Sequence, residues 1–130
     1  MSYILTCKDS KDTDNNTPKY LGADANIDIK VRRNHIYFYT DVNKKSAMEL
    51  NIKLKDVERD ILDKYKSHNF HKEYIYLHIN SYGGCVFSCL SIIDTINNIK
   101  VPVVSIVEGA AASAATMISA VCNHRLIHKN

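Results

Sequence analysis

Strand-like and helix-like segments alternate along most of this 130-residue chain, and this alternation limits the fold more than any other feature. His35–Thr40 is rich in aromatic and β-branched residues, which favours a strand. Val103–Val107 is almost wholly apolar, as parallel strands buried on both faces tend to be. The order predicts an α/β domain with a mainly parallel sheet and right-handed crossovers. We expect strands at 35–40, 74–79, 103–107 and 125–128, and helices at 45–65, 86–99 and 110–121. Apolar residues at helical spacing mark the packed side of the first two helices: Leu50, Leu54, Val57 and Ile61 in the first, and Val86, Cys89, Leu90, Ile93, Ile96 and Ile99 in the second.

The composition divides the chain into two parts. Residues 1–28 are rich in Asp, Asn, Lys and Thr, which predicts an irregular N-terminal arm, and residues 29–130 are expected to form the α/β domain. The N-terminus lacks the basic start and long apolar stretch of a signal peptide. The least polar run, 101–122, is dominated by small residues and contains Glu108, which favours a buried strand and helix over a membrane span. We therefore expect a cytoplasmic protein whose cysteines are free thiols.

Charge and cysteine spacing exclude two classes of partner. The 17 Lys and Arg against 14 Asp and Glu give a net charge of +3, and the basic residues are scattered along the chain. Proteins that bind nucleic acids gather Lys and Arg on one face, so no nucleic-acid partner is expected. Cys85 and Cys89 share a helix face, but no third ligand stands at a suitable spacing. We therefore expect no metal site.

Two predicted strand-to-helix turns have an unusual composition. Asn80–Gly84 ends in paired glycines, whose backbone can adopt positive φ and expose amide N–H groups at a helix N-terminus. Gly109–Ala115 places a single hydroxyl, that of Ser113, within a run of alanines. Both turns follow parallel strands and therefore meet at the carboxyl edge of the sheet, where α/β proteins form their sites. Taken separately, each turn also fits a purely structural role.

Together the two turns and the helix between them resemble the caseinolytic Clp protease proteolytic subunit. The resemblance rests on Leu77–Gly84, on Ile92–Ile96 and on Gly109–Ser113, and the family's pattern runs from Gly84 to Ser113 without a gap. It extends over about residues 34–130. It implies the family's ClpP/crotonase-like fold of stacked β-β-α units and the activity of a serine endopeptidase.

The resemblance assigns roles to four residues. Ser113 would be the nucleophile that attacks a peptide carbonyl and forms an acyl-enzyme. The backbone N–H groups of Gly84 and Ala114 would form the oxyanion hole. Gly83 would leave room for an extended substrate strand beside the turn.

The resemblance also implies partners. A member of this family would form a homo-oligomeric ring, take peptide or unfolded protein substrates and dock an ATP-driven AAA+ unfoldase. It would need no cofactor of its own, because ATP acts only through the unfoldase. Tyr76 matches one aromatic docking position, His78 replaces another, and Tyr82 stands where the family commonly has proline. We interpret Glu108, next to Gly109, as a subunit-contact or solvent-facing residue.

The catalytic base is harder to place. The family uses a histidine and then an aspartate, both C-terminal to the serine. His128 follows Leu126–Ile127 much as the family's histidine follows two apolar residues, but it lies only 15 residues after Ser113. That spacing is too short for the helix, strand and return between them. Matching Arg125 and Asn130 to the family's Arg and Asn places the base beyond Asn130, so we predict a truncated chain with little activity.

Two other functions stay open. The chain could be a non-catalytic ClpP-like assembly subunit, which joins rings of active partners without cutting. It could also be an acyl-CoA enzyme of the related crotonase fold, which uses a similar oxyanion hole without a nucleophilic serine. The Ala111-Ala112-Ser113 sequence disfavours the second alternative.

Overall fold

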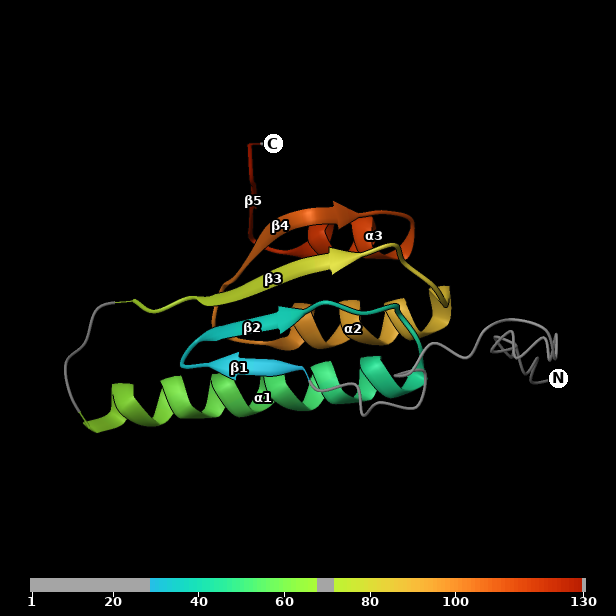
Figure 1. Cartoon of the computed structure of the whole chain (residues 1–130). Helices are drawn as coiled ribbons and strands as arrows, with labels where there is room; N and C mark the ends of the chain where they lie inside the picture. Colours follow the sequence, from blue (N-terminus) through green and yellow to red (C-terminus); the bar gives the residue numbers. More distant parts are fainter. Residues whose placement is uncertain (1–28, 68–71, 130) are drawn as a thin grey trace, which may run out of the picture.

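The computed structural model describes residues 29–67 and 72–129, which form a five-stranded sheet with three helices (Figure 1). The predicted irregular arm, residues 1–28, lies outside the described residues, and the extent of the α/β domain stays a prediction. The strands are β1 (Lys30–Arg32), β2 (His35–Phe38), β3 (Ile75–Ser81), β4 (Val103–Ala111) and β5 (His124–Ile127). The helices are α1 (Lys44–Ser67), α2 (Val86–Asn98) and α3 (Ala114–Val121).

The sheet has the strand order β1-β2-β3-β4-β5. Strands β2 to β5 are parallel, with helices in the connections between them, whereas β1 pairs antiparallel with β2. This confirms the predicted α/β class with a mainly parallel sheet. Strand β1 was not predicted, because only three residues form it and two of them are charged.

The helices pack on one side of the sheet. Ile36 and Phe38 of β2 are fully buried on that side, as are Leu77 and Ile79 of β3. Helix α1 contributes the buried residues that its spacing predicted, namely Leu50, Leu54, Val57 and Ile61. Side chains at the intervening strand positions point to the opposite side, which we call the open face.

The turn before α3 differs from the prediction. Gly109 does not end β4, which continues to Ala111, and α3 begins at Ala114 rather than at residue 110. The sheet register shows why, since Ile79 pairs with Val107 and Ser81 pairs with Ala111. Strand β4 therefore has two more residues than β3 between these pairs. This bulge lets the alanines stay in the sheet despite their helical propensity.

The buried face of α2 was only partly predicted. Cys89 and Ile96 are buried as expected, but Val86 and Leu90 are 48% and 42% exposed. Ser88 and Ile92 occupy the buried face in their place. The helix is apolar on more than one side, so the spacing of its apolar residues could not identify the side that packs.

The cysteines also differ in part from expectation. Cys89 and Cys122 are free thiols, as predicted. Cys85 is disulfide-bonded, so the prediction is wrong at that position. Among the described residues, no helix is both long enough and apolar enough to span a membrane.

Candidate active site at the carboxyl edge of the sheet

The turns that follow β3 and β4 lie side by side at the carboxyl edge of the sheet (Figure 1). The Ala112 N–H donates a hydrogen bond of 3.1 Å to the Ser81 carbonyl, and this bond joins the end of one strand to the start of the other turn. The buried Ser81 hydroxyl in turn accepts a 3.1 Å bond from the Gly83 N–H. The structure thus brings the glycine turn and the serine turn together, as their sequences predicted.

Ser113 has an unusual backbone conformation. Its φ of 52° and ψ of −125° place it at a sharp turn between β4 and α3. Among the described residues, only Arg33 shares a positive φ without being glycine. Such conformations cost about 1–3 kcal/mol, and they persist only where neighbouring contacts hold them. The turn exposes the serine at the edge of the sheet, as the strand–turn–helix elbow of α/β-hydrolases does.

The strain at Ser113 makes a testable prediction about stability. Ser113→Gly should raise the free energy of unfolding by about 1 kcal/mol, because glycine adopts positive φ without a Cβ penalty. Ser113→Ala keeps the Cβ and should give no such gain. Urea denaturation followed by circular dichroism measures both variants. Equal stabilities for the two variants would show that the turn stores no strain.

The two glycines have close neighbours. A Cβ on Gly83 would lie 2.8 Å from the Ser113 Cβ and 2.9 Å from the Ala114 nitrogen. A Cβ on Gly84 would lie only 2.2 Å from the Val42 carbonyl oxygen. The φ angles of 99° and 144° also lie in the region that favours glycine. Gly83 therefore leaves the space beside Ser113 open, whereas Gly84 lets the turn pack against Val42, between β2 and α1.

Two backbone amides are available near Ser113. At the bridge between Val42 and Gly84, the Val42 N–H donates to the Gly83 carbonyl and the Cys85 N–H donates to the Val42 carbonyl, each at 2.8 Å. The bridge therefore leaves the Gly84 N–H unused. Ala114 is the first residue of α3, where helical N–H groups lack a partner within the helix. Neither amide donates a hydrogen bond to another described residue. Both can therefore donate a hydrogen bond to a ligand oxygen.

No histidine is hydrogen-bonded to Ser113 within the described residues. The His128 N–H donates to the Val107 carbonyl at 3.1 Å, which continues the β4–β5 pairing. The His128 imidazole lies against a carboxylate, with its Nε2 3.6 Å from Glu108 Oε1. The prediction that the base is a residue other than His128 therefore stays a prediction.

Glu108 lies in a cluster that sequence analysis missed. Its carboxylate accepts hydrogen bonds from the Tyr39 hydroxyl and, at 2.7 Å, from His78 Nδ1. The side chain is 18% exposed, so it is partly covered by its neighbours, and its interpretation as a subunit-contact or solvent-facing residue stays a prediction. Burial opposes its ionisation, but the two hydrogen bonds and the nearby histidines prevail and lower the pKa of Glu108. The hydrogen bond to Glu108, with burial, raises the pKa of Tyr39 to about 12.

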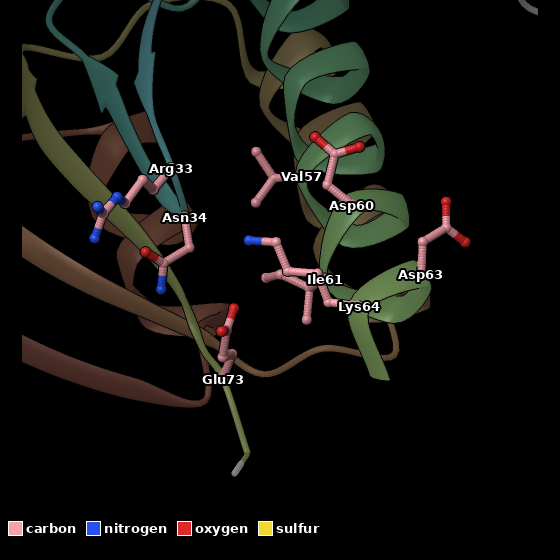
Figure 2. Close-up of a pocket in the computed structure, with 8 residues that line it drawn as sticks. All are labelled: Arg33, Asn34, Val57, Asp60, Ile61, Asp63, Lys64 and Glu73. Carbon is pink, nitrogen blue, oxygen red and sulfur yellow. The ribbon is translucent and has the colours of Figure 1, made fainter. Parts of the chain in front are cut away.

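A cavity of about 720 Å³ lies at the other end of the sheet, away from Ser113. Figure 2 shows Val57 and Ile61 projecting from α1 into it, with Arg33 and Glu73 on the opposite side. This is the end where β2 and β3 begin, whereas α/β proteins bind ligands where strands end. Within residues 29–67 and 72–129, no group of three or more His, Cys, Asp or Glu side chains is placed to hold a metal ion.

Comparison with protein families identifies the class of this fold and site. The model of the Clp protease family matches residues 25–127. The chain therefore belongs to the Clp protease family, which confirms the resemblance seen in its sequence and supports a ClpP-like serine protease at the family level.

Individual relatives match parts of the chain. The ATP-dependent Clp protease proteolytic subunits of Streptococcus mutans and Leuconostoc citreum are both 56% identical to it over 45 residues, or 35% of this chain. Those residues make up 23% and 22% of the two relatives, so the match spans less than a quarter of their length. The solved structure of ClpP1 from Listeria monocytogenes superposes with a TM-score of 0.59 at 26% identity. That superposition covers 69% of this chain and 47% of ClpP1.

Proposed function

We propose that this chain provides the nucleophile and oxyanion hole of a Clp-type serine endopeptidase. Ser113 is the nucleophile, and the Gly84 and Ala114 amides hold the oxyanion. The observation that carries this proposal is the elbow at Ser113, held at φ 52° directly beside Gly83 and Ala114 in a member of the Clp protease family. Gly83 keeps the approach to Ser113 open for an extended substrate chain.

The proposed reaction proceeds by acyl transfer. The Ser113 hydroxyl attacks the carbonyl carbon, and the carbonyl oxygen becomes an oxyanion that accepts hydrogen bonds from the two amides. Removal of one such donor typically raises the barrier by about 3–4 kcal/mol. The leaving amine departs with a proton, and water then hydrolyses the acyl-enzyme. A general base must take the serine proton, and within the described residues no histidine is bonded to Ser113.

The family also suggests how such a site is assembled. We propose that the working protein is a homo-oligomeric ring in the cytoplasm that receives peptides or unfolded proteins from an AAA+ unfoldase. Support comes from the relatives, which are named proteolytic subunits of an ATP-dependent protease. The site itself consists of a hydroxyl and two amides, so the proposed chemistry needs no cofactor.

A second candidate function is a non-catalytic assembly subunit. The lack of a hydrogen bond between Ser113 and any described histidine favours it, because a serine without a base is a weak nucleophile. In such a subunit the sharp turn at Ser113 would have a structural role only.

An activated ester distinguishes the two candidates. A p-nitrophenyl ester needs no protonation of its leaving group, and a buffer base can take the Ser113 proton, so Ser113 should release close to one equivalent of p-nitrophenolate per chain in an initial burst. Turnover should then be very slow, because deacylation also needs the base. The burst is followed by absorbance under stopped flow, with short fluorogenic peptides showing little hydrolysis.

The variants make this test specific. Ser113→Ala should abolish the burst, and His128→Ala should leave it unchanged. If wild-type chain gave no burst, the assembly subunit would be the better account. Sustained peptide turnover that both variants abolish would instead make His128 the base.

A further inference from the structure

The open face carries a layer of aromatic and imidazole rings from β2 and β3. Tyr76 stacks on His35 with ring centroids 4.7 Å apart, and Tyr37 stacks on His78 at 4.4 Å. The rings of His35 and His78 lie 5.2 Å apart. These contacts fix the orientation of both imidazoles, and His78 is only 7% exposed.

A chain of hydrogen bonds runs through this layer and ties three strands together. His35 Nδ1 of β2 lies 2.9 Å from His78 Nε2 of β3. His78 Nδ1 lies 2.7 Å from Glu108 Oε1 of β4, and the second carboxylate oxygen accepts the Tyr39 hydroxyl. Glu108 stands at the bulge of β4, five residues before Ser113.

The geometry limits how many protons the pair can hold. The ionised Glu108 accepts a hydrogen bond, so His78 Nδ1 carries a proton. One further proton fits between His35 Nδ1 and His78 Nε2, and either nitrogen can be its donor. The pair can thus be neutral or singly charged with the contact intact. If both rings are charged, an N–H group on each side faces the other across 2.9 Å, and the contact must open.

From this we propose that His35 and His78 form an acid-sensitive latch between β2, β3 and the Glu108 end of β4. The latch is closed while the pair carries at most one positive charge, and it opens when both imidazoles are protonated. It goes beyond the proposed peptidase chemistry and does not depend on it, because none of its groups belongs to the proposed nucleophile or oxyanion hole.

Neighbouring groups on the open face reinforce this behaviour. Burial lowers the pKa of His35, and the charge of His78 lowers it further. Arg32 of β1 pairs with His35 across the strands and adds a positive charge on the same face. The other titratable or charged groups on this face are Lys30 from β1, Tyr37 from β2 and Tyr39 just after it, Tyr74 just before β3 and Tyr76 within it, Lys72 over the Tyr74 ring, Glu108 from β4, and His124 with His128 from β5 and its end.

The direction of the pH effect follows from proton binding. In the unfolded chain both histidines take up protons near the ordinary pKa of about 6.5. In the folded chain the second proton binds only at lower pH. Between that lower pH and about pH 6.5, the unfolded state therefore binds more protons than the folded state. Stability from the latch is therefore present above about pH 6.5 and is lost as the pH falls below it.

The test compares urea unfolding of the full chain from pH 8 to pH 5 with that of His35→Asn. Asparagine can accept or donate at the position of Nδ1 but does not titrate, so His78 can be charged without breaking the contact. Each pH unit over which only the unfolded state binds the extra proton changes the folding equilibrium about tenfold. The wild-type folding constant should fall about tenfold more than that of His35→Asn over this range. His124→Asn, on the same face but outside the latch, should behave as wild type.

A second measurement needs no variant. The ring ¹⁵N resonances of His35 and His78 in the wild-type chain should show a first titration of the pair and a second one clearly below pH 6.5. Equal pH dependence of wild type and His35→Asn would overturn the proposal. So would two imidazoles that titrate independently near pH 6.5.

Discussion

Gly84→Ala should lower the free energy of unfolding by about 3–4 kcal/mol, a large loss of stability for a single added methyl group. The added Cβ would lie 2.2 Å from the Val42 carbonyl oxygen, which is backbone and cannot rotate away. The φ of 144° is also unfavourable for alanine. The clash would separate the turn from Val42 and break the two 2.8 Å hydrogen bonds of Val42 with Gly83 and Cys85, each worth about 0.5–1.5 kcal/mol.

Gly109→Ala is the matched control for this prediction. Its φ of 95° is similarly unusual, but the three atoms nearest to the added Cβ all belong to the Asn80 side-chain amide, the closest at 3.2 Å. A side-chain amide can move, so we expect a smaller loss of about 1–2 kcal/mol. Urea denaturation of the two variants beside wild type gives the comparison. Equal losses at the two positions would mean that the contact with Val42 does not control the turn.

Gly83→Ala should reduce the reaction of Ser113 with a small fluorophosphonate by at least about tenfold. The added Cβ would stand 2.8 Å from the Ser113 Cβ and 2.9 Å from the Ala114 nitrogen, and so would occupy the approach to both. Loss of one oxyanion donor alone typically costs about 10²–10³ in rate. The rate is measured by mass spectrometry of the intact chain, with peptide mapping to locate the adduct.

Folding must be separated from reactivity in this experiment. Each variant is therefore labelled under conditions where circular dichroism shows it folded, with imidazole added to all samples as an external base. Gly109→Ala should label at the wild-type rate, because Gly109 contacts Asn80 rather than Ser113. If folded Gly83→Ala labelled as fast as wild type, Gly83 would not border the reactive hydroxyl.

Local patterns in the sequence predicted most of the fold. The apolar spacing of α1 identified all four of its expected buried residues, because one side of this helix packs and most other positions are charged. The spacing was less informative for α2, where Val86 and Leu90 are apolar yet exposed. The predicted start of α3 was wrong, because the pairing of Ala111 with Ser81 in the sheet outweighs the helical propensity of alanine.

The candidate site was predicted in the same uneven way. Ser113, Gly83 and Gly84 were identified because their turns follow parallel strands, and such turns meet at one edge. The cluster around Glu108 was missed, since its members come from three strands and depend on the register between them. The alternation of side chains along each strand could have revealed it. His35, Tyr37 and Tyr39 share one side of β2 and the residue after it, and Tyr76 and His78 share one side of β3.

The structure of a phosphonate adduct would test the central claim most directly. The account predicts an adduct on the Ser113 hydroxyl, with one phosphonyl oxygen about 2.7–3.1 Å from the backbone nitrogens of both Gly84 and Ala114. An adduct on another serine, or an oxygen on Ser113 that points into solvent away from both amides, would contradict it.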